Sequence, residues 1–259
     1  MKPSNLEILN QSFDVQAPNF ESDTVQFSKQ DYLDYTLSNI APNKHDTILE
    51  VASGTCICGR FFSPFVQAVV CLDATISMLQ AGKKEADKNH LDNMFFMKGC
   101  AEELPFLDNS FDIVFSRLAF HHFTNVSTAF SEMVRVLKPN GKLIMIDMEA
   151  PHETLRSIED KLETLRDPSH VKNLSRDEMQ KLFENYGLHI EKCDSKKIEQ
   201  NLMAWLDLTF TNETAKEKII TCMQEDINGK RKTGFYPFQN DKGICFNQNW
   251  VFILGRKSI

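Results

Sequence analysis

The sequence contains no hydrophobic run long enough to cross a membrane. Its most apolar window, 61–72, is interrupted by Ser63, Pro64 and Gln67, whereas a spanning helix needs about 20 predominantly apolar residues. Residues 1–7 also lack the apolar core that a signal peptide carries. We therefore expect a cytoplasmic protein that does not insert into a membrane.

An excess of basic charge is missing as well. The formal net charge is -7, and the basic runs at 230–232 and 256–257 are short. Because binding to nucleic acid or to an anionic surface needs concentrated Lys and Arg, we expect neither kind of partner. The hydrophobic share of 42% is ordinary, and 259 residues are enough to bury one full α/β core.

The seven cysteines lack the arrangement of a disulfide framework. Their number is odd and most of them lie inside apolar runs, which predicts reduced, buried thiols. Cys56 and Cys58 resemble a fragment of a metal site, but no second close pair or Cys/His spacing completes it. We therefore expect no bound metal.

Strand-like and helix-like patterns alternate through the first 150 residues. The strand-like runs lie at 47–51, 68–73, 94–97, 111–116 and 142–148. Helical periodicity occupies 77–89 and 126–137, and Pro139 and Gly141 are expected to stop the second helix. Such alternation with short connections predicts right-handed crossovers and a parallel sheet covered on both faces.

After residue 150 the pattern becomes more helical. The expected elements are an amphipathic helix at 153–166, a helix opened by the capping box 175–178 and ended by Gly187, a strand at 188–193, one or two helices at 198–228 and a strand at 249–254. We expect the extra helices to cap the ligand edge of the sheet.

No composition shift or repeat divides the chain, so one domain over 1–259 is expected. Its parts are an N-terminal helical segment at 1–45, a cofactor-binding half at 46–150 and a substrate-side half at 151–259, with a helical insertion at about 195–245.

One turn carries most of the chemical information. Residues 47–56 (TILEVASGTC) form an apolar run that includes Glu50 and passes into a small-residue turn around Gly54, and a second run, 69–73, ends in Asp73. Ligands of an open parallel sheet sit outside the carboxyl ends of its strands, and glycine lets the backbone approach them closely. By itself the pattern fits two interpretations. It is either a nucleotide-type binding site in which Asp73 binds a ribose, or an ordinary strand–helix connection whose acidic side chains are solvated.

Further motifs favour the first interpretation. They are 13–17 (FDVQA), 99–115 (GCAEELPFLDNSFDIVF), 117–123 (RLAFHHF), 135–142 (RVLKPNGK) and 165–171 (LRDPSHV). Together with 47–56 they resemble the class I S-adenosylmethionine-dependent methyltransferases, and within them the bacterial ubiquinone/menaquinone-biosynthesis C-methyltransferase type. The resemblance covers roughly residues 13–195, and several ordered motifs are more specific than one.

The resemblance implies a fold and a reaction. The fold would be a Rossmann-like, doubly wound and mostly parallel seven-stranded sheet with an antiparallel last strand, plus helical cap elements. The cofactor would be S-adenosyl-L-methionine, and the partner a small-molecule methyl acceptor that is methylated on carbon, oxygen or nitrogen. The protein would be a monomer or a homodimer, and the sequence does not identify the acceptor.

The resemblance also implies a set of cofactor-binding residues. Glu50 would face the methionine amine and Asp73 would accept both ribose hydroxyls, with the backbone of 52–54 beneath the amino-acid part. The full expected set is Glu50, Ala52, Ser53, Gly54, Asp73, Ala74, Met78, Cys100, Ala101, Arg117 and Leu118. Met78, expected on the adenine, fits an ordinary helix core equally well, and Ala101 fits an ordinary loop.

Three positions in or beside this set depart from the family. Its glycine-rich turn has here only Gly54, flanked by Ala52 and Cys56. Ala52 is expected to be a mild change, whereas Cys56 costs about 1 kcal/mol if the turn requires a left-handed conformation there. A factor of ten in affinity corresponds to about 1.4 kcal/mol, so binding is expected to survive. Cys100 stands where an Asp is common, and a thiol is a poorer acceptor for the adenine amino group.

Three histidines are candidates for catalysis. Methyl transfer needs alignment, and it needs a base if the acceptor carries a proton. His121 and His122 follow the fourth strand and His170 lies in the 165–171 motif, and a histidine accepts a proton near neutral pH. Each is equally explained as a structural histidine that holds loop backbone. Aromatic residues that fit an acceptor pocket or the core are Tyr32, Tyr35, Phe123 and Trp205.

Two other functions stay open at this point. Cys56 and Cys100 favour a noncatalytic relative that binds S-adenosylmethionine or a partner protein. A nicotinamide-dependent oxidoreductase is disfavoured, because residues 52–57 do not supply the G-x-G-x-x-G turn that such an enzyme uses.

Overall fold

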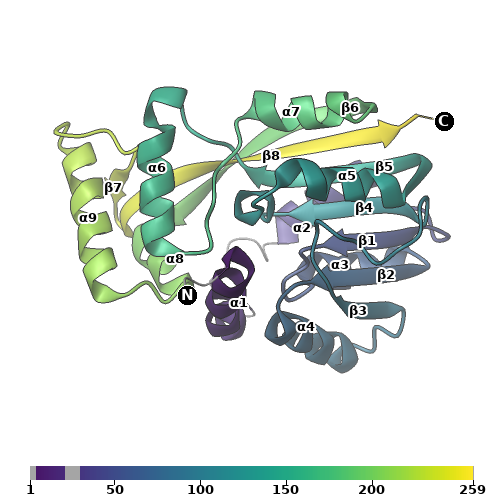
Figure 1. Ribbon diagram of the computed structural model, residues 1–259. Coiled ribbons are helices and arrows are strands. Elements are labelled where there is room, and N and C mark those ends of the chain that lie inside the picture. The colour runs from purple at the N-terminus through teal and green to yellow at the C-terminus, as the bar shows by residue number, and fades with distance from the viewer. Residues whose placement is uncertain (1–3, 21–29, 259) are drawn as a thin grey trace.

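A twisted sheet runs through the molecule (Figure 1). The computed structural model describes residues 4–20 and 30–258, and in that part of the chain eight strands pair in the order β3-β2-β1-β4-β5-β8-β6, with β7 beside β8. The strands are β1 (Thr47–Val51), β2 (Ala68–Asp73), β3 (Met94–Lys98), β4 (Phe111–Arg117), β5 (Leu137–Met148), β6 (Leu188–Asn201), β7 (Phe238–Asn240) and β8 (Gly243–Lys257).

Strand directions give the sheet its class. Strands β1 to β5 pair with one another only in parallel, whereas β8 runs antiparallel to β5, β6 and β7. This confirms the predicted α/β, Rossmann-like, mostly parallel sheet with an antiparallel last strand. The described residues form eight strands instead of the seven predicted, and the additional one is β7. It forms a tight hairpin with the start of β8, where Gly243 takes a φ of 100°.

Helices cover both faces of the sheet. They are α1 (Asn5–Gln16), α2 (Gln30–Ile40), α3 (Ile57–Phe62), α4 (Ile76–Lys88), α5 (Val126–Val136), α6 (Glu153–Arg166), α7 (Arg176–Asn185), α8 (Leu202–Leu208) and α9 (Glu213–Ile227). The alternation of β1 explains this layering, because Leu49 and Val51 join the core beneath α5 and α7 while Ile48 joins the core beneath α2, α3 and α4.

Strand β5 begins earlier than the sequence pattern predicts. Helix α5 ends at Val136 and the chain enters β5 at once, so Pro139 and Gly141 lie inside the strand instead of stopping the helix. The β4–β5 register shifts across this stretch, because Leu137 pairs with Phe111 and Lys142 with Ile113. A bulge therefore accommodates the proline.

The last two long strands carry a helical cap. Strand β6 continues to Asn201 and β8 begins at Gly243, so both reach past the parallel strands. At this end α6, α8 and α9 gather around β7 and the first part of β8 (Figure 1), with a separate apolar core that includes Leu162, Trp205 and Ile219. Two helices therefore occupy most of the predicted 198–228 segment, and the residues before Leu202 belong to β6.

The N-terminal segment lies across the opening between the cap and the sheet. Helix α1 stands between the cap helices and α4 (Figure 1), and α2 packs on the sheet. Of the helical segment expected at 1–45, residues 1–3 and 21–29 lie outside the described residues. No helix among the described residues has the length and apolarity needed to cross a membrane. All seven cysteines are free, but the predicted burial holds for four of them only, because Cys100, Cys193 and Cys222 are half-buried.

Candidate active site

A cavity of about 670 Å³ opens at the carboxyl ends of the parallel strands. It lies where the strand order reverses between β1 and β4, the usual ligand position in an open α/β sheet. Its size is within the range of small-molecule sites. One side, the turn side, is formed by the ends of β1, β2 and β4, and the other, the cap side, by the segment after β4, the 163–170 region and α8, while α1 lines both.

The structure brings the predicted residues together with one exception. Those that line the cavity are Glu50, Ala52, Ser53, Gly54, Asp73, Ala74, Cys100, Ala101, Arg117, Leu118, His121, His122 and His170. Met78 does not line it. Its side chain is completely buried on the inner face of α4, as is expected of a helix core residue.

The turn after β1 is more strained than the sequence suggested. Ala52, Gly54 and Cys56 all adopt left-handed conformations, with φ values of 54°, 53° and 60°. The expectation that Ala52 is a mild change was therefore wrong, because it bears the same cost of about 1 kcal/mol as Cys56. The backbone N–H of Ser53 donates to the carbonyl of Leu72 at 3.0 Å, which anchors the turn to β2.

Two helix glycines, missed in the sequence, allow neighbouring elements to approach this turn. A Cβ on Gly82 of α4 would lie 2.6 Å from the carbonyl oxygen of Thr55, and one on Gly59 of α3 would lie 2.7 Å from Oε2 of Glu50. Real side chains essentially never make such contacts. The signal for both was a glycine inside a helical segment, which often has a packing reason.

Two buried carboxylates border the turn side. Oε2 of Glu50 accepts from the N–H of Gly59 at 2.9 Å, and burial raises the pKa of Glu50 to about 7 although the charge of Arg117 acts to lower it. Oδ2 of Asp73 accepts from the N–H of Gly54 at 2.8 Å, and burial raises its pKa as well. The turn side therefore offers two carboxylates to donors on a ligand.

On the cap side, His121 is paired with an acid that sequence reasoning missed. Nδ1 of His121 lies 2.6 Å from Oδ1 of Asp147, near the end of β5. Oδ2 of Asp147 accepts from the N–H groups of Ala119 and Phe120. Burial opposes both charges, yet the pair raises the pKa of His121 and lowers that of Asp147. The available signal was a single acid inside the apolar run at 142–148.

His122 differs in its electrostatics although it is adjacent in sequence. Its ring centroid lies 4.2 Å from that of His121, and burial, together with that neighbour, lowers the pKa of His122 to about 3. Nδ1 of His122 is 3.1 Å from Oγ of Ser169. His122 is therefore a neutral imidazole at physiological pH.

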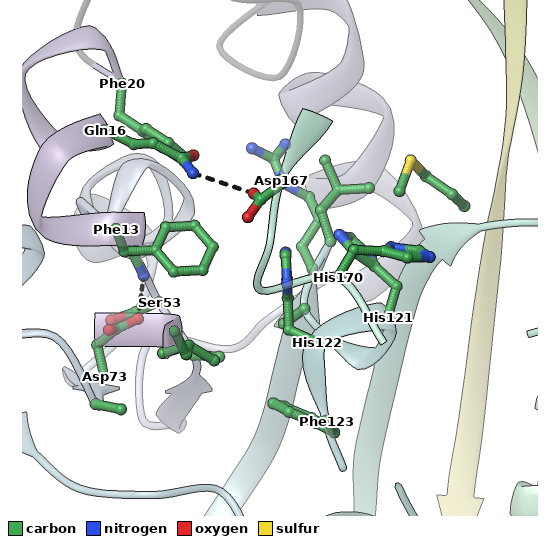
Figure 2. Close-up of a pocket in the computed structure, with 18 of the residues that line it drawn as sticks. Phe13, Gln16, Phe20, Ser53, Asp73, His121, His122, Phe123, Asp167 and His170 are labelled. Atoms are coloured by element: carbon green, nitrogen blue, oxygen red, sulfur yellow. Dashed lines mark hydrogen bonds between the residues drawn. The ribbon is translucent and has the colours of Figure 1, made fainter. Parts of the chain in front are cut away.

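His170 completes the cluster from the other side. Its ring centroid is 5.8 Å from that of His121, and its Nε2 lies 2.9 Å from Oδ1 of Asp160 on α6. Within the described residues its buried Nδ1 has no hydrogen-bond partner. The three histidines approach one another as Figure 2 shows.

Aromatic and charged groups form the remaining walls. Phe123 and Trp205 line the cavity, whereas Tyr32 and Tyr35 do not. The guanidinium of Arg166 lies 4.3 Å from the centroid of the Trp205 ring. In the described part of the chain, no group of three or more His, Cys, Asp or Glu side chains is placed to hold a metal ion.

Comparisons with known proteins identify the family of the chain. Residues 49–145 match the family model of a methyltransferase domain. The chain is 32% identical over 212 residues to the uncharacterized methyltransferase YcgJ of Bacillus subtilis, across 81% of this chain and 84% of that protein. It is 29% identical over 187 residues to the ubiquinone/menaquinone biosynthesis C-methyltransferase UbiE of Shewanella pealeana, across 70% of this chain and 74% of that protein.

Solved structures share the fold. The crystal structure of YcgJ superposes with a TM-score of 0.82 at 30% identity, covering 89% of this chain and all of that one. The Haemonchus contortus phosphoethanolamine N-methyltransferase 2, solved with S-adenosyl-L-methionine, has a TM-score of 0.63 at 20% identity, covering 89% of this chain and 53% of that one, which shows the fold alone. Since the YcgJ match extends over most of both chains in sequence and structure, the protein belongs to the methyltransferase family.

Proposed function

We propose that the protein is an S-adenosylmethionine-dependent methyltransferase that acts on a small molecule. One observation carries the proposal. A single cavity is lined both by the strained turn with its two carboxylates and by His121, whose Nδ1 is paired with the buried Asp147, so a bound cofactor and a proton acceptor would face the same space. Membership of the methyltransferase family supports the same reaction.

The turn side fits the cofactor by its donor set. The ammonium group and the ribose diol of S-adenosylmethionine both donate hydrogen bonds, and the acceptors available are Glu50 and Asp73. An ammonium beside Glu50 would hold that buried carboxylate ionised. The backbone of Ala52 and Gly54 would lie beneath the amino-acid part, with Cys100 and Ala101 at the adenine edge and Arg117 and Leu118 at the methionine side.

When bound, S-adenosylmethionine supplies a methyl group on a sulfonium and leaves as the neutral thioether. The residues of the chain have to align the acceptor atom with that methyl group and remove the acceptor's proton. His121 is best placed for this proton, because Asp147 holds its Nδ1–H and leaves Nε2 available. Asp147 then stabilises the imidazolium that forms.

The other two histidines are assigned supporting roles. His122, kept neutral, would accept a hydrogen bond from the acceptor through Nε2 and so orient it. His170 is the weaker catalytic candidate, because its Nε2 is already engaged by Asp160.

The acceptor is proposed to be a small molecule with an apolar, planar part. Phe123 and Trp205 offer aromatic surface on the cap side, and the acidic net charge argues against a nucleic-acid acceptor. Because the UbiE relatives are named as ubiquinone/menaquinone biosynthesis C-methyltransferases, quinone-like carbon acceptors are the first class to test, followed by phenols and amines. We propose a cytoplasmic monomer or homodimer.

Calorimetry with S-adenosylmethionine, S-adenosylhomocysteine and NAD tests the cofactor. We expect heat from the first two and none from NAD, and a protein that binds neither S-adenosyl compound is not a methyltransferase of this kind. Screening acceptors for S-adenosylhomocysteine release then tests the reaction. Tight cofactor binding without release for any acceptor class would favour the noncatalytic alternative.

A further inference from the structure

Helix α1 is fastened to the turn side of the cavity by two polar contacts. Oγ1 of Thr75 donates to the side-chain oxygen of Asn10 at 3.0 Å, and Oγ of Ser77 donates to Asp14 at 2.6 Å. Thr75 and Ser77 follow directly on the strand that ends in Asp73. The position of α1 is therefore set by the elements that form the cofactor site.

The same helix also reaches the cap side. Nε2 of Gln16 donates to Oδ2 of Asp167 at 3.1 Å, and the ring of Phe13 meets that of His122 edge-on at a centroid distance of 5.0 Å. Figure 2 shows Phe13 and Gln16 extending from α1 towards His122 and Asp167. Gln16, Asp167 and Ser169 are all buried.

A chain of hydrogen bonds with a defined direction connects Gln16 to His122. Burial acts to raise the pKa of Asp167, but the charge that His122 carries when protonated, the charge of Arg166 and the hydrogen bonds from Ser169 and Gln16 lower it below its usual value, so Asp167 is ionised. A carboxylate only accepts, so the hydroxyl of Ser169, 2.6 Å from Oδ1 of Asp167, donates its proton there. The hydroxyl oxygen is then left to accept from Nδ1–H of His122.

The direction of these hydrogen bonds determines which ring nitrogen of the neutral His122 carries no proton. With the proton on Nδ1, Nε2 keeps its lone pair, and His122 lines the cavity. We propose that Gln16 and Ser169 are positioning residues that act through Asp167 to hold His122 in the Nδ1–H tautomer, so that Nε2 presents a hydrogen-bond acceptor to the substrate. The role towards a substrate rests on the proposed function, whereas the tautomer is a property of the ligand-free protein.

The proposal narrows the acceptor class. An unprotonated Nε2 that lines the cavity needs a ligand group that donates a hydrogen bond to it. The methyl acceptor therefore carries an O–H or N–H group near its reacting atom. A site built around such a hydrogen bond rejects analogues that lack the donor, because its own polar group would stay unpaired.

Nuclear magnetic resonance of the full-length, ligand-free protein with ¹⁵N-labelled histidines tests the tautomer. The resonances of His122 are assigned as those lost in His122→Asn. We expect Nδ1 of His122 to carry the proton in the unmodified protein. In Ser169→Ala, and more weakly in Gln16→Leu, we expect the Nε2-protonated form to appear.

Matched variants separate positioning from general damage. Ser169→Thr keeps the hydroxyl and is expected to keep the Nδ1–H tautomer, and Val15→Ala changes an exposed neighbour on α1 and is expected to leave the spectrum of His122 unchanged. An Nε2–H tautomer in the unmodified protein, or an unchanged tautomer in Ser169→Ala, overturns the proposal. An unchanged tautomer in Gln16→Leu overturns the role of Gln16. None of these results depends on cofactor binding, which calorimetry tests separately.

Discussion

Nδ1 of His121 lies 2.6 Å from Oδ1 of Asp147, which connects the segment after β4 to the end of β5. His121 lines the cavity, whereas Asp147 is buried and is not among its lining residues. The two residues are 26 positions apart and belong to different motifs of the sequence. Backbone N–H groups also bind the carboxylate, so it stays charged although it is buried. A buried Asp–His pair of this kind can accept a proton at a fixed point in space.

The first prediction concerns Asp147→Asn. Loss of the carboxylate removes the charge that raises the pKa of His121, so the base weakens and the acidic limb of the pH–rate profile moves to lower pH. S-adenosylhomocysteine release with a responsive acceptor should fall about 100-fold, the usual order of a general-base contribution. His121→Gln should abolish the limb altogether.

The control for this prediction is Asp92→Asn, an exposed acid outside the cavity. It should change neither the rate nor the profile. An unshifted limb in a folded Asp147→Asn protein would remove His121 from the role of base.

The second prediction concerns the stability cost of Glu50. Its folded pKa of about 7 lies above the ordinary value of 4.5, so between these pH values the folded state binds more protons than the unfolded state and stability declines as pH rises. The free energy of unfolding should decline in total by on the order of 3 kcal/mol, since one pKa unit corresponds to about 1.4 kcal/mol. Glu50→Gln should flatten this dependence and unfold at higher urea than the unmodified protein above pH 7.

The same variant should bind S-adenosylmethionine less tightly, because it lacks a charge for the ammonium group. Urea titrations near pH 4.5 and above pH 7, with calorimetry on the same samples, measure both effects. A variant with equal or tighter cofactor binding contradicts the assignment of Glu50.

The third prediction concerns Asp73→Ala. The variant removes the proposed acceptor of the ribose hydroxyls and the acceptor for the N–H of Gly54. A hydrogen bond to a charged group contributes about 1.5–3 kcal/mol, so the affinity for S-adenosylmethionine should fall about tenfold or more. Asp87→Asn, an exposed acid on α4, is the matched control. Equal affinities in the two variants would withdraw the ribose assignment.

The fourth prediction compares two glycines. A Cβ on Gly54 meets nothing within 4 Å, so Gly54→Ala should cost only the left-handed strain of about 1 kcal/mol. A Cβ on Gly82 would press on the backbone of Thr55, so Gly82→Ala should displace the turn and cost about 1–3 kcal/mol, as overpacking typically does. Thermal unfolding and cofactor calorimetry, with Lys84→Ala on the exposed face of α4 as control, distinguish them. Equal losses of stability and of cofactor affinity in both variants would show that the structure around Gly82 relaxes to accept a Cβ.

Several structural features followed from local patterns. Strands β1 to β4 and helices α4, α6 and α7 lie within one or two residues of their expected ranges, because apolar periodicity, the Ser175 capping box and Gly187 act over short distances. Strands β6 and β8 are longer than expected, since their outer parts are stabilised by pairing with each other, which no local pattern encodes.

Some residues of the candidate site could likewise be predicted from local sequence, and others could not. Asp73 and Gly54 could be placed from the sequence, because the strand–turn–helix pattern fixes which strand end they occupy. Met78 could not, because the rotation of α4 against the sheet turns that side chain into the core. The contact of Gln16 with Asp167 joins residues 151 positions apart and was equally out of reach.

The sequence by itself determined the class of the sheet, the strand ends that face the ligand and the residue types available there, because periodicity and turn chemistry are local. Only the tertiary structure decided that Asp147 raises the pKa of His121, that Ser169 orients His122 and that α1 contacts both sides of the cavity. These contacts arise when distant segments pack together and burial changes the pKa of the groups they bring into contact.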